Sequence, residues 1–342
     1  MDSPRRNLSV AGVEPGADDG AAPSPSAPSS SRLAALVYEE EIQPSDIEGI
    51  GDGALLGSGA FGEVRQVLWR KTPAAAKVAH DNMPREHKEL FLRELELMVR
   101  CRHPNVVQFL GFVDTPFIIV MEFLPMGDLR TYWRSRKLGV AHKTRIAIDI
   151  LRGLGYLHNR KPASIIHRDI KPTNILMTVS GMAKITDFGL SRLTHGQNMS
   201  SRHGAPASAV GRGWSPESRA NPPMVTVVPT EGRGSPSLKK SKNVGTVPYM
   251  APEAEDRIYD TKVDIYSAGV TFYELFEEIP YTDGFLWALA PYPVRSIVAS
   301  MGSLQPADRP NALDLIEAFA ATQPSAKLKP MLPESASCCS VS

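Results

Sequence analysis

The sequence predicts an α+β protein with two lobes, a small one rich in strands followed by a larger one rich in helices. In residues 55–78, apolar runs alternate with turn residues, as in strands joined by hairpins. A helical pattern over residues 86–101 follows, and strand-like runs return over residues 106–123. From Leu138 onward helical patterns dominate, as over residues 145–158 and 263–276. Strands first and helices afterwards are typical of a fold in which the two are segregated.

The bulk composition fits a large buried core and excludes several classes of protein. Of 342 residues, 42% are hydrophobic, and 38 Lys and Arg balance 37 Asp and Glu, so no nucleic-acid partner is indicated. The cysteines, Cys101, Cys338 and Cys339, fit neither a disulfide framework nor a metal site. Residues 1–30 lack the apolar segment of a signal peptide, and the longest apolar run is too short to cross a bilayer. We therefore expect a cytoplasmic protein.

Composition also divides the chain into one domain, two tails and an insertion. Segments rich in Pro, Ser, Gly and Ala cannot bury enough apolar surface to order themselves. On this ground we expect disordered tails at residues 1–40 and 323–342, and a low-complexity insertion at about residues 194–243 of the domain. The domain spans residues 41–322, with a small lobe at about residues 47–122 and a large lobe at about residues 125–322.

Residues 57–64 form a glycine-rich run, G-S-G-A-F-G-E-V. Glycines let the backbone approach phosphate oxygens because no Cβ intervenes. The run alone is a weak signal, since simple turns and dinucleotide-binding loops also contain such glycines. A dinucleotide loop would open directly into a helix, whereas residues 64–69 are strand-like. A phosphate-binding loop inside a hairpin therefore fits better.

Lys77 lies in an otherwise apolar strand, A-A-A-K-V. A lone lysine is usually a solvated surface charge, but burying a charge is costly unless it is paired. Glu94, on the helix that follows, is the candidate partner, because Leu90, Leu95 and Met98 can pack inward around it.

The strongest single signal is H-R-D-I-K-P-T-N at residues 167–174. Phosphoryl transfer needs a carboxylate to orient the attacking hydroxyl, a cation to neutralise the transferred group and an oxygen to hold metal. Asp169, Lys171 and Asn174 supply this set. Asp187, in the D-F-G sequence that follows, adds a second oxygen ligand of the kind that Mg²⁺ prefers.

Taken in order, these motifs resemble those of the eukaryotic protein kinase family, from about residue 47 to residue 319 apart from the insertion. The A-P-E sequence at residues 251–253 completes the set. The stretches L-W-R-K-T-P-A-A-A-K and H-P-N-V-V-Q-F-L-G resemble the tyrosine-kinase-like group of that family. The resemblance implies a bilobed protein kinase fold and an ATP- and Mg²⁺-dependent protein kinase active in intracellular signalling.

The resemblance also implies a role for individual residues. Lys77, paired with Glu94, would hold the α- and β-phosphates, Asp169 would orient the substrate hydroxyl, and Lys171 would neutralise the transferring group. Asn174 and Asp187 would hold Mg²⁺. The expected ATP-binding residues are Leu56, Gly57, Ser58, Gly59, Gly62, Val64, Ala75, Lys77, Met121, Glu122, Leu124 and Leu176. Asp264 would anchor the catalytic loop, and Arg309 would pair with Glu253.

Substrate preference can also be inferred from the resemblance. Lysine two residues after the catalytic aspartate, here Lys171, is typical of serine/threonine kinases, as is G-T-V-P-Y-M at residues 245–250. Leu190, directly after D-F-G, suggests serine over threonine as acceptor. Proteins are the expected substrates.

The insertion could regulate such an enzyme. Arg168 precedes the catalytic aspartate, and a phosphate on Ser241 or Ser237 could dock on it and order the loop. The alternative is a solvated low-complexity insertion without a regulatory role.

Two features depart from the family pattern, one inside the large lobe and one in the C-terminal tail. Fewer residues than usual separate Glu274 from Arg309, which indicates either a reduced substrate-docking surface or a defective sequence that would not fold. At the C-terminus, Cys339 fits a prenylation motif and Cys338 a palmitoylation site, so a membrane anchor is one hypothesis. A disordered tail with chance cysteines is the other.

Two functional alternatives remain open at this point. A pseudokinase scaffold would bind nucleotide or partners without turnover, but such proteins usually lose the equivalents of Lys77, Asp169 or Asp187, and this chain retains all three. A small-molecule kinase of the same fold is disfavoured by the A-P-E and D-R-P sequences, which shape a platform for protein substrates.

Overall fold

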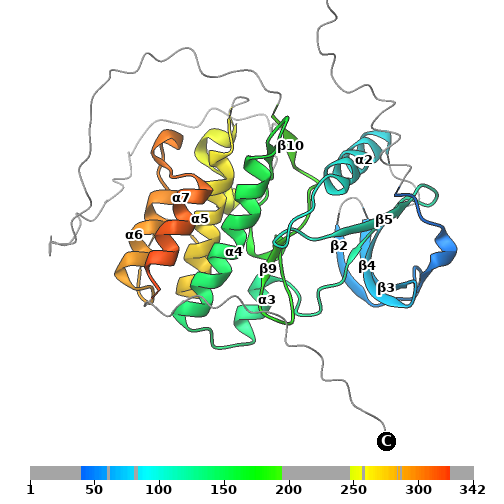
Figure 1. The fold of residues 1–342 in the computed structure, drawn as a ribbon, viewed down its shortest axis with the longest axis horizontal. Helices are drawn as coiled ribbons and strands as arrows, with labels where there is room; N and C mark the ends of the chain where they lie inside the picture. The colour runs from blue at the N-terminus through cyan, green and yellow to red at the C-terminus, as the bar shows by residue number, and fades with distance from the viewer. Residues whose placement is uncertain are drawn as a thin grey trace, which may run out of the picture.

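The computed structural model shows two lobes, a curled sheet with one helix against it and a larger body of helices (Figure 1). It describes residues 40–59, 62–80, 84–194, 247–255, 259–282, 284–285 and 287–323. The expected α+β bilobed kinase fold is confirmed by this arrangement. The sites proposed at Ser237, Ser241, Cys338 and Cys339 lie outside the described residues, as do nearly all of the expected tails and insertion.

The small lobe is built on a six-stranded antiparallel sheet in the order β1-β3-β4-β6-β5, with β2 paired to β3. Its first strand follows a short 3-10 helix, Pro44–Asp46. The strands are β1 (Ile47–Glu48), β2 (Leu55–Gly59), β3 (Gly62–Trp69), β4 (Thr72–Ala79), β5 (Phe109–Val113) and β6 (Ile118–Glu122).

The central strand β4 separates two apolar clusters because successive side chains of a strand point to opposite faces. Ala74 and Ala76 lie in a cluster confined to the small lobe, together with Val67 and Val120. Ala75, between them, belongs to the large core that continues into the helical lobe. The two faces of the sheet therefore have different roles, and one of them connects the lobes.

Helix α2 (Arg85–Val99) packs against this second face. Phe91, Leu95 and Met98 are buried in the large core. Glu94 lies on the same side of the helix and is only 3% exposed. The helix thus carries one carboxylate into an otherwise apolar contact, as its sequence predicts. It ends two residues before Cys101, slightly earlier than expected.

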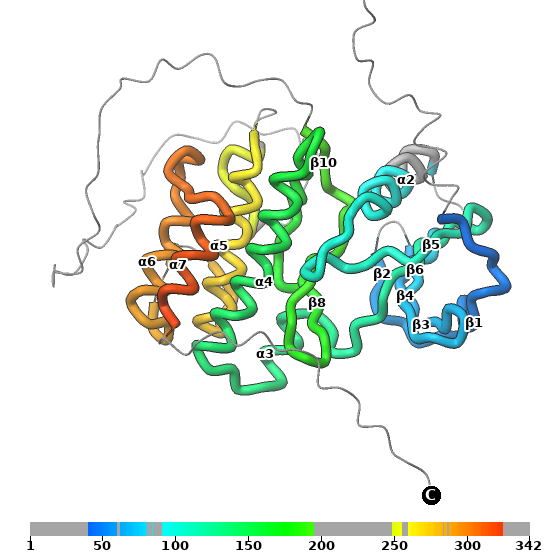
Figure 2. Tube along the Cα trace, viewed as in Figure 1, coloured from blue at the N-terminus to red at the C-terminus, as the bar shows by residue number. Residues whose placement is uncertain are grey.

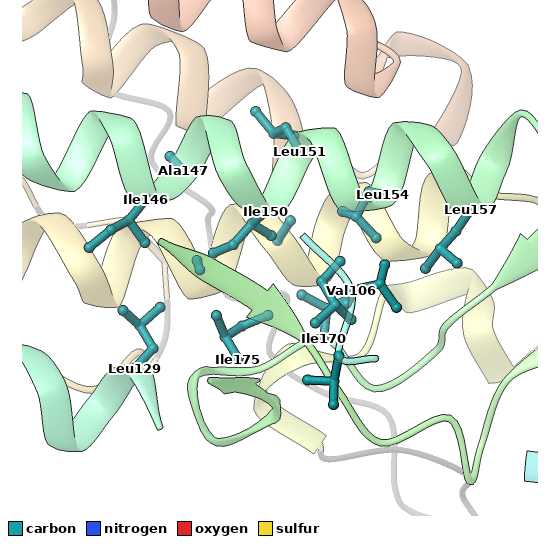
Figure 3. Packing of buried hydrophobic residues seen from close by; sticks show 14 of the residues in the cluster. Val106, Leu129, Ile146, Ala147, Ile150, Leu151, Leu154, Leu157, Ile170 and Ile175 are labelled. Carbon is teal, nitrogen blue, oxygen red and sulfur yellow. The ribbon is translucent and has the colours of Figure 1, made fainter. Parts of the chain in front are cut away.

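The helices of the large lobe pack side by side (Figure 2). Helix α4 contacts both α5 and α7, and α5 contacts α6. Figure 3 shows Ile150 and Leu154 of α4 in one apolar cluster with Val106, Ile170 and Ile175. All five side chains are buried. The helices are α3 (Leu129–Arg134), α4 (Val140–His158), α5 (Lys262–Glu277), α6 (Tyr292–Met301) and α7 (Ala312–Ala321).

The large lobe also contains short strands and 3-10 helices. The strands β8 (Ile175–Met177) and β9 (Ala183–Ile185) form a hairpin, and β10 (Arg192–Leu193) pairs with β7 (Ile165–Ile166). These pairs hold the segments that carry residues 167–174 and 187–189. Further 3-10 helices span Pro172–Asn174, Val247–Tyr249, Pro252–Glu255 and Pro306–Asp308.

The shortened part of the large lobe is held by the carboxylate of Glu277, at the end of α5. It accepts hydrogen bonds of 2.8 Å from the backbone N–H groups of Ala288, Leu289 and Ala290. The described residues between α5 and α6 form no helix. A single buried carboxylate therefore holds together the connection where the family usually has more chain. Whether the shortening reduces the docking surface or impairs folding stays a prediction.

Aromatic rings fill the space behind this connection. Tyr273 of α5 makes edge-on contacts with Tyr281, Phe285 and Trp287, at centroid distances of 5.2–5.7 Å.

Among the described residues, none of the helices is long and apolar enough to be a candidate membrane span.

Candidate active site

Lys77 and Glu94 form the expected ion pair between β4 and α2. The Lys77 ammonium lies 2.8 and 2.6 Å from the two carboxylate oxygens of Glu94. A third group, the carboxylate of Asp187, lies 3.8 Å from the same ammonium. Burial lowers the pKa of Lys77, but the two carboxylates outweigh burial and raise it above its usual value, so the side chain stays charged.

Asp169, Lys171 and Asn174 are joined by hydrogen bonds within one loop. Lys171 Nζ donates to Asp169 Oδ2 at 2.7 Å, and Asn174 Nδ2 donates to the same oxygen at 2.8 Å. Asn174 Nδ2 also reaches the backbone oxygen of Asp169 at 2.9 Å. The carboxylate is 6% exposed and is therefore held in one orientation by a cation and an amide.

Asp264, at the start of α5, fixes the backbone of this loop. Its oxygens accept the N–H groups of His167 and Arg168 at 2.8 and 2.7 Å, and they contact His158 Nε2 at 2.8 Å. Burial would raise the pKa of the Asp264 carboxyl, but His158 and these donors hold it below its usual value. The expected anchor is thus an ionised, fully buried group.

The D-F-G segment turns sharply at Asp187, where φ is +66°. Residues other than glycine seldom adopt a left-handed conformation, and when they do it is often at functional sites. Phe188 makes an edge contact with the ring of His167 at a centroid distance of 5.2 Å. The apolar neighbour of Asp187 thereby packs onto the loop that holds Asp169.

Arg168, the proposed phosphate-docking residue, is engaged with its own surroundings. Its guanidinium donates to the backbone oxygen of Leu190 at 3.2 Å and lies over the ring of Tyr259 at 5.4 Å. Burial lowers its pKa below the usual value. The regulatory hypothesis itself concerns residues outside those described, so it stays a prediction.

The glycines of the loop at residues 57–62 differ in the space around their Cα atoms. A Cβ on Gly62 would lie 2.1 Å from the backbone oxygen of Val78, so a side chain cannot fit between β3 and β4. Among the residues that the structure describes, none apart from the chain neighbours of each glycine lies within 4 Å of a Cβ placed on Gly57 or Gly59. Gly62 is therefore required by packing, whereas the space over Gly57 and Gly59 is open to a ligand. Ser58 lies between the two, paired in register with Glu63.

The expected apolar part of the nucleotide site comes together at the face of the sheet that joins the large core. Ala75 lies directly opposite Met121 on the neighbouring strand. Val64, Leu124 and Leu176 pack against the same core while remaining partly exposed. Leu56 is 46% exposed on β2 and lies outside this cluster.

Glu122 has a partner that the sequence did not suggest. Its carboxylate accepts hydrogen bonds from Lys184 Nζ at 2.6 and 2.9 Å and from the backbone N–H of Gln108 at 2.7 Å. Lys184 stands between buried Ala183 and Ile185 in β9. In the sequence, apolar residues on both sides of this lysine are a weak signal for a paired charge, and they do not identify a partner 62 residues away. This pair ties the segment between the lobes to the strand that precedes Asp187.

The expected pair of Arg309 and Glu253 is present in the large lobe. The guanidinium makes two hydrogen bonds to the carboxylate, at 2.5 and 2.9 Å, and is buried. It also donates to the backbone oxygen of Lys262 at 3.1 Å and lies over the ring of Tyr266 at 5.0 Å. The A-P-E sequence is thereby locked to the segment after α6.

The described residues contain no group of three or more His, Cys, Asp or Glu that could hold a metal alone. Mg²⁺ needs none, because it takes one or two carboxylates and completes its coordination with phosphate oxygens and water. The side chain of Asp187 is 45% exposed, and the amide oxygen of Asn174 is left over after its Nδ2 binds Asp169. These two donors fit a magnesium ion that arrives with a nucleotide.

Comparison with known proteins assigns the chain to a family. A model of the family "Protein tyrosine and serine/threonine kinase" matches residues 52–221, which include Lys77, Asp169 and Asp187. The serine/threonine-protein kinase VIK of Arabidopsis thaliana is 34% identical over 70% of this chain and 48% of its own length. Serine/threonine-protein kinase 12 of the same plant is 40% identical over 49% of this chain and 37% of its own length.

A third relative bears on the group within the family. The serine/threonine-protein kinase CTR1 of Arabidopsis thaliana is 33% identical over 64% of this chain and 23% of its own length. These relatives agree with a tyrosine-kinase-like type. The chain spans half or less of the length of these curated relatives.

Proposed function

We infer that this chain, which belongs to the protein kinase family and to its tyrosine-kinase-like group, transfers the γ-phosphoryl group of ATP to serine and threonine hydroxyls of other proteins. Members of the family use ATP and Mg²⁺. The observation that carries the proposal is one arrangement in space. Lys77 contacts both Glu94 and Asp187, while Asp169 is oriented by Lys171 and Asn174.

Each of these groups has a defined task in such a reaction. Lys77 holds phosphate oxygens, and Glu94 and Asp187 keep its charge and orientation. Asp169 accepts a hydrogen bond from the substrate hydroxyl and orients its lone pair toward the phosphoryl group. Magnesium, when bound by Asp187 and Asn174, neutralises charge on the phosphates.

Lys171 links the carboxylate to the transferred group. Its ammonium lies 2.7 Å from Asp169 and is 21% exposed, so it can also face an incoming phosphoryl oxygen. The position of this lysine supports serine and threonine as acceptors, since it is typical of kinases with that preference. The relatives named above are serine/threonine kinases, which agrees with the proposal.

The test is transfer of label from γ-labelled ATP to a generic protein acceptor. Wild type should label the acceptor, and Asp169→Asn should be slower by about 10²- to 10⁴-fold, because the hydroxyl is no longer oriented. Asp114→Asn, an exposed aspartate in the turn between β5 and β6, is the matched control and should behave as wild type.

Nucleotide binding, measured in parallel, distinguishes two possible reasons for an absence of phosphoryl transfer. Absence of transfer with ATP-Mg still bound would overturn the enzyme proposal and favour a scaffold without turnover. Absence of both would contradict the assignment of Lys77 and the glycine-rich loop as a nucleotide site.

A further inference from the structure

A cavity of about 380 Å³ lies beside the proposed catalytic loop. Lys171 and Thr173 of that loop form one wall. The other polar groups come from Arg130 of α3, from Tyr249 in the 3-10 helix Val247–Tyr249, and from Glu274 of α5. Because Lys171 contacts Asp169, whatever occupies this cavity lies next to the residue that orients the acceptor hydroxyl.

A partly buried hydrogen-bond network sets the charge of the far wall. Arg130 Nη2 donates to Glu274 Oε2 at 2.9 Å and to the hydroxyl of Tyr249 at 2.5 Å. The Tyr249 hydroxyl donates to the same Glu274 oxygen at 2.9 Å. The other oxygen, Oε1, accepts the backbone N–H of Tyr281 at 3.0 Å. Both oxygens of Glu274 are therefore in use.

The exposed charge in this cavity is consequently positive. The Glu274 side chain is 3% exposed, whereas that of Arg130 is 32% exposed. Both hydrogen bonds of Arg130 to described residues use Nη2, so the N–H groups of Nε and Nη1 remain as donors. Burial lowers the pKa of Arg130, but Glu274 and Tyr249 raise it above its usual value, so the guanidinium stays protonated.

We propose that this cavity receives an acidic or phosphorylated side chain of the protein substrate, close in sequence to the serine or threonine that is phosphorylated. The inference rests on the proposed kinase activity and adds a preference among its substrates. An anion gains charge-assisted hydrogen bonds from Arg130 and attraction from Lys171. A basic side chain finds Glu274, the carboxylate among the described residues that line the cavity, already neutralised by Arg130, and it meets like charge at Arg130.

The experiment compares peptides that share one acceptor serine. A neighbouring position carries glutamate, phosphoserine, alanine or arginine, and this position is moved along the peptide one residue at a time. For wild type we expect kcat/KM for the best acidic peptide to exceed that of the alanine peptide by about fivefold, the effect of a partly exposed charge pair. The arginine peptide should be the poorest substrate.

Variants of α3 assign the preference to Arg130. Arg130→Gln should bring the ratio of acidic to alanine peptide close to one, while Arg130→Lys keeps the charge and should retain part of the ratio. Arg134→Gln removes an exposed arginine from the same helix and should leave the ratio at its wild-type value. High salt should reduce the wild-type ratio, because a pair of this kind is screened. The glutamate and phosphoserine arms show which anion is preferred.

Equilibrium binding of the same fluorescent peptides tests the inference without turnover. If no peptide is phosphorylated, the proposed function fails, while a preference for acidic peptides in binding that Arg130→Gln removes would still support the cavity assignment. Equal kcat/KM and equal affinity for acidic and alanine peptides would overturn the inference and leave the kinase activity intact. A preference that persists in Arg130→Gln would overturn it as well.

Discussion

Substitution of Glu277 tests directly how the connection between α5 and α6 is held. The residue is 2% exposed, and its carboxylate accepts three backbone N–H groups of residues 288–290, each at 2.8 Å. In Glu277→Gln the amide oxygen can still accept, but the amide nitrogen is a donor and faces another donor. At least one buried N–H therefore loses its partner.

The magnitude follows from the cost of hydrogen bonds to charged groups. Each contributes about 1.5–3 kcal/mol, and a buried donor without a partner costs a similar amount. We expect Glu277→Gln to lower the free energy of unfolding by about 3 kcal/mol at pH 7. Urea and thermal unfolding, followed by circular dichroism, measure the change. Glu317→Gln, at an exposed position of α7, is the matched control and should be neutral.

The pH dependence provides a second, independent check. Burial would raise the pKa of Glu277, but the three N–H donors outweigh it and hold the pKa below its usual value of 4.5. A carboxyl with a depressed folded-state pKa stabilises the fold above the unfolded-state pKa, and this contribution is lost as pH falls through the folded value. The difference between wild type and Glu277→Gln should therefore shrink below about pH 4. An equal midpoint at pH 7, or a difference that does not change with pH, would refute the reasoning.

Three further substitutions test other contacts. Lys77→Met should reduce phosphoryl transfer by about 10²-fold or more while the fold persists, because the α- and β-phosphates lose the ammonium that holds them; steady-state kinetics near wild type would contradict this. Arg309→Leu should lower the free energy of unfolding by about 3–5 kcal/mol, because Glu253 is left without its buried partner; an unchanged urea midpoint would contradict it. Lys184→Met should weaken ATP binding, measured by calorimetry, because Glu122 is released between the lobes; unchanged affinity would leave that pair without a role in the nucleotide site.

Much of the fold and the site could be predicted because the signals are local. Residues 167–174 carry carboxylate, cation and amide within one loop, so a short stretch of chain determines their hydrogen bonds. Lys77 and Glu94 could be paired because a charge in a buried strand requires a partner. The apolar spacing in α4 and α5 predicted both helices, with boundaries shifted by a few residues.

Contacts between distant charged residues could not be predicted in this way. The pair of Glu122 and Lys184 spans 62 residues, and that of Arg130 and Glu274 spans 144. Each of these side chains is compatible with a solvated surface. The partner is selected only by the fold, which brings Arg130 of α3 to Glu274 of α5 and Lys184 of β9 to Glu122. The hydrogen bonds from residues 288–290 to Glu277 could not be predicted either, because every residue other than proline has a backbone N–H and the sequence does not show which of them binds a carboxylate.

The central claim is that Asp169 orients a serine or threonine hydroxyl for attack on the γ-phosphoryl group of ATP. The most direct measurement uses ATP with ¹⁸O in that group and identifies the acceptor residues by mass spectrometry. The account predicts heavy phosphate on serine and threonine with wild type, and none above background with Asp169→Asn in the same time. Unlabelled phosphate, label confined to tyrosine, or equal labelling by Asp169→Asn would contradict it.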